Sequence, residues 1–152
     1  MEIVPKCFFE GRSTHTLDEK GRLAIPARFR EVLNQKGDSS IVVTNLNNCL
    51  VAFAREDWQK IKDKAVDLPL FDNAATIYLR YFISGAVECP LKQNRILIPP
   101  HLRGLAGLRK EVALVGHLIR FEIWDRVKWE EEFERVKESF PEASQSLSDL
   151  GI

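Results

Sequence analysis

The sequence predicts a β-rich α+β fold in which two tandem β-α-β repeats form one pseudo-twofold barrel with flanking helices. The main observation is an internal repeat, because residues 17–30 (LDEKGRLAIPARFR) match residues 91–103 (LKQNRILIPPHLR). Equivalent pairs in the two copies are Arg22 and Arg95, Pro26 and Pro99, Arg30 and Arg103, Leu50 and Phe121, Phe53 and Trp124, and Trp58 and Trp129. One copy of about 50–60 residues buries too little apolar surface to be stable alone, so both are expected to share a core.

A hairpin-like turn opens each copy. In the first, a strand over residues 13–17 leads through D-E-K-G into a strand over residues 22–25. Asp18 at the start and Gly21 at the end suit a type I turn closed by a left-handed residue. Gly21 adopts a positive φ without a steric penalty, and Asn94 holds that place in the second copy.

Short helices, apolar strands and a closing helix complete each copy. Pro26 and the pair Pro99–Pro100 are expected to start the short helices, and Gly37 and the glycines at 104 and 107 to end them. The apolar strands are predicted over residues 41–44 and 49–54, with counterparts over 112–115 and 119–123. The remaining helices are predicted around Trp58 to Ala65, over 74–83, and from 126 to 140 with a stop near Pro141.

These elements divide the chain into four expected parts. They are a first module over residues 8–66, a linker helix over 67–83, a second module over 84–138 and a flexible C-terminal tail over 139–152.

Composition argues against several functional classes. The chain has 152 residues, 45% of them hydrophobic, and no apolar run near the roughly 20 residues that cross a bilayer. The N-terminus lacks the pattern of a secretory signal, so a cytoplasmic protein is expected. Three cysteines and three histidines without ligand spacing predict neither a disulfide framework nor a metal site. Without a catalytic or phosphate-loop motif, we expect no enzyme, no cofactor and no small-molecule substrate.

The formal net charge of zero conceals a local asymmetry. Residues 91–110 contain five basic and no acidic residues, whereas five glutamates crowd into residues 130–138. Residues 12–36 contain six basic against three acidic residues. Local distribution matters more than the sum, because surface fields reach only about 8–10 Å at physiological salt.

The two turns are the candidate functional site. Pseudo-twofold symmetry predicts that Arg22 and Arg95 lie side by side, and guanidinium groups suit both phosphates and guanine edges. Asp18 is expected to cap the turn or to orient Arg22. The candidate DNA-binding residues are Asp18, Lys20, Gly21, Arg22, Lys92, Gln93, Asn94 and Arg95.

The motifs HTLDEKGRLAIPARFR, SGAVEC, KEVALVG and FEIWD together resemble the MraZ family of bacterial transcriptional regulators, which carry two SpoVT-AbrB-type modules. The resemblance spans residues 8–135. It implies an AbrB-like, swapped-hairpin barrel, closed homo-oligomeric rings, and binding of double-stranded DNA at direct repeats upstream of the division and cell-wall gene cluster. A nucleoid-associated repressor is implied, with Asp18 and Arg22 matching the family's D-x-x-x-R signature.

The second copy departs from that signature. Leu91 is followed directly by Lys92, and Asn94 replaces the glycine. Two explanations fit: the turn is one residue shorter, or its acid has become Leu91. The modules are therefore expected to contribute unequally. The rival functions are a scaffold whose turns dock an acidic protein, an antitoxin-like regulator, and, most distantly, an enzyme using Cys89 or a histidine.

Overall fold

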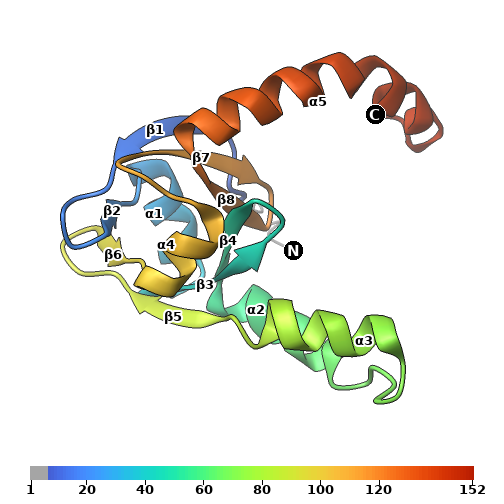
Figure 1. Cartoon of the computed structure of the whole chain (residues 1–152), viewed down its shortest axis with the longest axis horizontal. Helices are drawn as coiled ribbons and strands as arrows, with labels where there is room; N and C mark the ends of the chain where they lie inside the picture. Colours follow the sequence, from blue (N-terminus) through green and yellow to red (C-terminus); the bar gives the residue numbers. More distant parts are fainter. Residues whose placement is uncertain (1–6) are drawn as a thin grey trace, which may run out of the picture.

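A computed structural model describes residues 7–152 of the chain. Its strands are β1 Arg12–Thr16, β2 Arg22–Ala24, β3 Ser40–Leu46, β4 Cys49–Ala54, β5 Val87–Pro90, β6 Arg95–Leu97, β7 Glu111–His117 and β8 Arg120–Asp125. Its helices are α1 Ala27–Gln35, α2 Arg55–Ala65, α3 Asn73–Tyr78, α4 Pro100–Ala106 and α5 Arg126–Ser146, with a π-helix over Leu79–Ile83 and a 3-10 helix over Ser148–Leu150. The predicted β-rich α+β class is confirmed, and the strands pair antiparallel (Figure 1).

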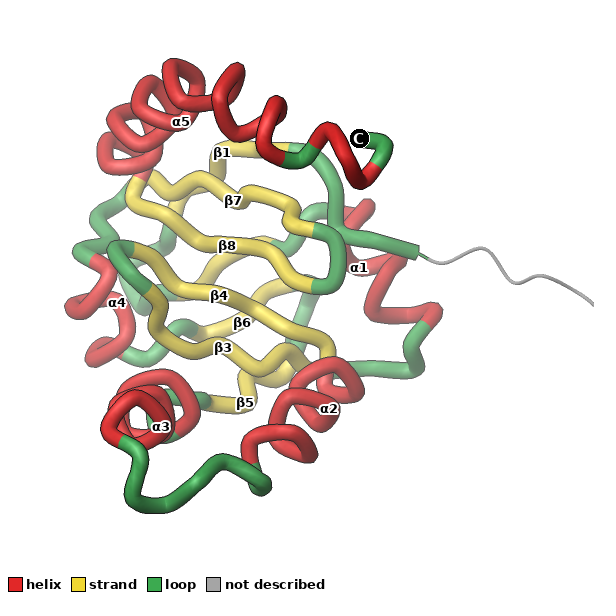
Figure 2. Tube along the Cα trace, turned by 90° about the vertical axis from the view of Figure 1, so that its right-hand side faces the viewer, coloured by secondary structure: helices red, strands yellow, loops and turns green. Residues whose placement is uncertain are grey.

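The two copies exchange their first strands. The large sheet has the order β1-β7-β8-β4-β3-β5, so β1 of the first copy pairs with β7 of the second, and β5 pairs with β3 (Figure 2). All its pairings are antiparallel. Each copy therefore completes the sheet of the other, and neither can form its full set of strand pairs alone.

The strand register is symmetric between the copies. At the centre of the large sheet, β4 pairs with β8, and Leu50 faces Ile123 while Ala52 faces Phe121. The small sheet joins β2 to β6 around the pair Leu23 and Ile96. Exchanging equivalent residues reproduces each set of pairs, so one pseudo-twofold axis relates the copies in both sheets.

A single main core joins the two copies. Phe9 and Phe29 from the first copy surround Phe121 from β8, with ring centroids 4.8–5.3 Å apart. All three are at most 1% exposed. The same cluster contains Leu23 and Ile96 from the small sheet. The expectation of a shared core is thus confirmed.

The flanking helices cover smaller clusters outside this core. Helix α2 places Trp58 against Phe53 and Phe82, the latter from the π-helix after α3. The first turns of α5 place Trp129 against Trp124. Of the helices in residues 7–152, none combines the length and the apolar composition that a membrane span requires.

The predicted end of the last helix near Pro141 is wrong. Helix α5 runs through Pro141 to Ser146. Pro141 cannot donate to the Lys137 carbonyl, but Lys137 is exposed, so water can satisfy that carbonyl. A second, smaller difference concerns Pro26, which caps α1 at its N-terminus instead of occupying the first helical position.

Candidate nucleic-acid interface

The two predicted turns lie side by side at one edge of the molecule. Pairing of β2 with β6 brings together residues that are more than 70 positions apart in the chain, with Arg22 opposite Leu97 and Ala24 opposite Arg95. In Figure 1 the turns before β2 and β6 project together at the left edge, away from the free end of α5. We call this edge, comprising residues 18–22 and 92–95, the turn surface.

The first turn is organised by the carboxylate of Asp18. One oxygen, Oδ1, accepts the backbone N–H groups of Lys20 at 2.9 Å and Arg22 at 2.8 Å. The other, Oδ2, accepts Nε–H of Arg22 at 2.5 Å. Gly21 has a φ of +86°, as predicted for the residue that closes the turn. The Arg22 guanidinium is therefore held on a fixed turn.

These contacts change the acidity of Asp18. The backbone N–H of Arg22 lowers its pKa most, the Arg22 side chain and the Lys20 N–H add to this, and desolvation partly opposes it. The pKa falls from 3.8 to about 2, so Asp18 is ionised at neutral pH.

The second turn is one residue shorter. Lys92 N–H donates to Arg95 O at 2.9 Å, leaving only Gln93 and Asn94 between them, both at positive φ. In the first turn the equivalent bond runs from Asp18 N–H to Arg22 O. Lys92 thus stands in the place of Asp18, while Leu91 matches Leu17, and the alternative that the acid has become Leu91 is wrong.

One carboxylate serves both arginines. Arg95 Nη1 lies 3.4 Å from Asp18 Oδ2, the oxygen that also accepts from Arg22. The Arg95 and Arg22 side chains are 34% and 40% exposed, so both are accessible to a partner. The expected proximity of Arg22 and Arg95 is confirmed, but this bridge between the copies was not predicted from the sequence.

Arg103 is a further basic residue next to the turn surface. A Cβ added to Gly21 would lie 2.6 Å from Arg103 Cζ, so the guanidinium covers this glycine directly. Arg103 Nε–H donates to Ile98 O at 3.0 Å, and its twin Arg30 donates to Ile25 O at 3.1 Å. Repetition of an arginine four residues after the proline in both copies was the signal that could have placed them.

The remaining candidate residues are exposed around these arginines. Lys20, Lys92, Gln93 and Asn94 are all exposed. A groove of about 410 Å³ beside them is lined by Arg22, Pro90, Lys92, Gln93, Arg95, Ile96 and Leu97. Within residues 7–152, neither Lys20 nor Lys92 forms an ion pair. The turn surface therefore presents cations and amides to a partner.

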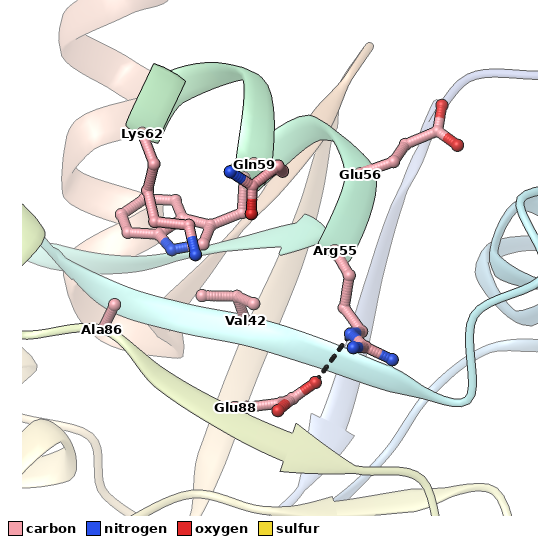
Figure 3. Close-up of a pocket in the computed structure, with 8 residues that line it drawn as sticks. Val42, Arg55, Glu56, Gln59, Lys62, Ala86 and Glu88 are labelled. Atoms are coloured by element: carbon pink, nitrogen blue, oxygen red, sulfur yellow. Dashed lines mark ion pairs between the residues drawn. The ribbon is translucent and has the colours of Figure 1, made fainter. Parts of the chain in front are cut away.

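Other parts of the structure offer weaker candidate sites. A pocket of about 440 Å³ lies between α2 and β5, but its Arg55 is paired with Glu88 at 2.8 Å (Figure 3). Burial raises the pKa of the Cys49 and Cys89 thiols to about 12 and about 11, which disfavours the nucleophilic thiolate. Among the described residues, no cluster of three or more His, Cys, Asp or Glu side chains could hold a metal ion.

Comparison with known proteins identifies the family. The sequence model of a protein family described as "MraZ protein, putative antitoxin-like" matches residues 8–81 and again residues 82–150. The chain belongs to the MraZ family. The two matches correspond to the two copies of the internal repeat.

Relatives in this family align over nearly their whole length. "Transcriptional regulator MraZ" of Syntrophobacter fumaroxidans is 40% identical over 97% of this chain and 99% of its own. The protein of the same name from Thermoanaerobacter sp. strain X514 is 43% identical over 93% of this chain and 98% of its own. By family, this MraZ chain is a transcriptional regulator.

Proposed function

We propose that this MraZ protein represses transcription by binding double-stranded promoter DNA through its turn surface. The observation that carries the proposal is the convergence of Arg22 and Arg95 on one carboxylate at an exposed edge. Arginine presents paired donors that match phosphate oxygens and the O6 and N7 atoms of guanine. We also infer that the exchanged strands close as the swapped-hairpin barrel expected of the family.

The target we propose is a set of direct repeats upstream of the division and cell-wall gene cluster, where the protein acts at the nucleoid. Binding by one protomer is expected to be weak, because one turn surface reaches few phosphates and each contact adds only about 0.9 to the salt slope. Several protomers on adjacent repeats gain affinity by linkage, by roughly 10²- to 10⁴-fold.

Footprinting on the DNA immediately upstream of the protein's own gene tests target, spacing and multivalency together. We expect protection of regularly spaced repeats by the wild type. Arg22→Ala should abolish that protection at the same protein concentration without changing the oligomer mass, and Lys60→Gln on α2 is the control. Equal binding to the upstream fragment and to a shuffled fragment would favour a scaffold over a DNA-binding regulator.

We propose that protomers assemble head to tail into a closed ring, with α5 of one copy on α2 and α3 of the next. Helix α5 has no buried residue along its 21 residues, whereas helices in proteins gain most of their stability from packing of an amphipathic face. Its distal half and the 3-10 helix that follows carry a stripe of exposed apolar side chains, formed by Val136, Phe140, Leu147 and Leu150. Such a stripe requires a partner to become buried.

A complementary groove lies at the opposite side of the protomer. Two adjoining hollows of about 470 Å³ each share Ile61, Ala74 and Tyr78 between α2 and α3. Lys64 and Arg120 line the same hollows, which suits the glutamates along α5. Stripe and groove are different surfaces, so their contact is heterologous and generates a ring when the rotation closes.

Light scattering after size exclusion tests this assembly. Phe140→Glu on the stripe and Ile77→Glu in the groove should each reduce the oligomer mass. Leu105→Glu on α4, which is 57% exposed and outside both surfaces, should not. An unchanged mass for both interface variants would rule out this contact.

A further inference from the structure

We propose that the two turns divide the work of DNA recognition: the first reads base edges and the second binds phosphate. This inference rests on the proposed DNA-binding function and adds a role for each turn. It starts from the replacement of the Asp18 carboxylate by the Lys92 ammonium at equivalent backbone positions.

The replacement makes the turns electrically different. Asp18 and Glu19 offset Lys20 and Arg22 in the first turn, so its formal charge is zero. Lys92 and Arg95 have no acid within the second turn, so its formal charge is two positive. Since the phosphate contribution to binding depends on cationic charge, most of it should come from the second turn.

The turns also differ in how firmly they hold their arginine. The Arg22 side chain donates Nε–H to the Asp18 carboxylate at 2.5 Å. The backbone N–H of Arg22 donates to the same carboxylate at 2.8 Å, so both the backbone and the side chain of Arg22 are held. Arg95 reaches that carboxylate only at 3.4 Å, across the interface between the copies. Base reading needs a guanidinium in a set orientation, whereas a phosphate accepts donors from many directions.

Lys92 completes the assignment because its ammonium is exposed and forms no ion pair within residues 7–152. A lysine is a flexible point charge with rotatable donors, which suits a phosphate better than a planar base edge.

Asp18 acts as a positioning residue, mainly for Arg22 in the first turn and weakly for Arg95 in the second, because its contacts with these arginines are 2.5 Å and 3.4 Å long.

A pair of variants separates the two roles. Arg22→Lys keeps the charge but removes the guanidinium fork, so discrimination between the upstream repeats and shuffled DNA should fall about 5- to 150-fold with the salt slope unchanged. Lys92→Gln should weaken binding to both DNAs equally and reduce the slope by about 0.9 for each protomer that engages the DNA. For one protomer, that reduction makes affinity about 3.5-fold less sensitive to a rise from about 50 to 200 mM salt.

Fluorescence anisotropy with both DNA fragments at four salt concentrations gives both readouts. Lys60→Gln makes the same charge change on α2, at a residue that does not line the proposed groove between α2 and α3, and should leave slope and discrimination unaltered. The inference is overturned if Lys92→Gln loses discrimination as much as Arg22→Lys, or if its slope equals the wild-type slope. Failure of the wild type to discriminate the fragments would instead reject the proposed function itself, and this inference with it.

Discussion

Replacing Phe121 by alanine tests whether the two copies fold as one unit. Phe121 belongs to the second copy, is 0% exposed, and packs on Phe9 and Phe29 of the first at 5.1 and 4.8 Å. Truncating a buried phenylalanine costs about 3–5 kcal/mol, because the transfer free energy of the ring is lost and a cavity remains. For a domain of this size each kcal/mol lowers Tm by about 2–4 °C, so a fall of about 6–20 °C is expected.

Circular dichroism at fixed protein concentration measures this change. Since exchanged strands and a shared core couple the copies, the variant should still melt in one transition. Tryptophan fluorescence of a Trp58→Phe background, which reports on Trp124 and Trp129 in the second copy, should give the same midpoint. Phe71→Ala is the control, because Phe71 is fully exposed and its loss should leave Tm unchanged.

Two results would refute the reasoning. One is a fall in Tm of less than about 2 °C for Phe121→Ala, well below the cost of a cavity in a close-packed core. The other is a biphasic melt in which the second copy unfolds while the first remains folded.

Three further predictions concern the turns and the cysteines. Because the folded-state pKa of Asp18 is about 2, below its ordinary 3.8, its contribution to stability is present above about pH 4 and is lost as the pH falls towards 2. The stability difference between wild type and Asp18→Asn in urea denaturation should therefore shrink over that range, and a constant difference would contradict it. Gly21→Ala should cost about 1–2 kcal/mol in the same assay through its positive φ, whereas Gly104→Ala, with open space at its Cβ, should stabilise α4. In a Cys7→Ser background, which removes the partly buried third cysteine, the buried Cys49 and Cys89 thiols with their raised pKa should react with a disulfide reagent at pH 8 only after unfolding, and rapid reaction of that folded variant would exclude their burial.

Local features of the turns were predictable because their chemistry is local. Gly21 and Asn94 both adopt the positive φ that their residue types indicated. The apolar runs that became β3, β4, β7 and β8 were also visible from composition; the range of β4 matches, and the ends of the other three differ by one or two residues. Such boundaries depend on strand partners, and the partners are far away in the sequence.

Two features of the candidate site needed coordinates. The repeat placed Arg22 and Arg95 together, but the bridge through Asp18 depends on side-chain reach across β2 and β6. The equivalence of Lys92 with Asp18 follows from backbone hydrogen bonds, because a one-residue deletion can be aligned in more than one way.

The extension of α5 past Pro141 was missed because proline inside a helix is usually disfavoured, and exposure of this segment was not known.

Because the two copies are fused in one chain, their amino-acid sequences are free to differ. Two separate modules meeting at a twofold axis would have to present the same residues on both sides, and such a pair cannot tell one direction along a duplex from the other. Here Asp18 in one copy and Lys92 in the other occupy equivalent positions, so the two halves of the turn surface differ in charge and every protomer has a direction. In the proposed DNA-binding role, a surface with that polarity suits repeats that all have the same orientation along a promoter, and it would fit a palindrome poorly.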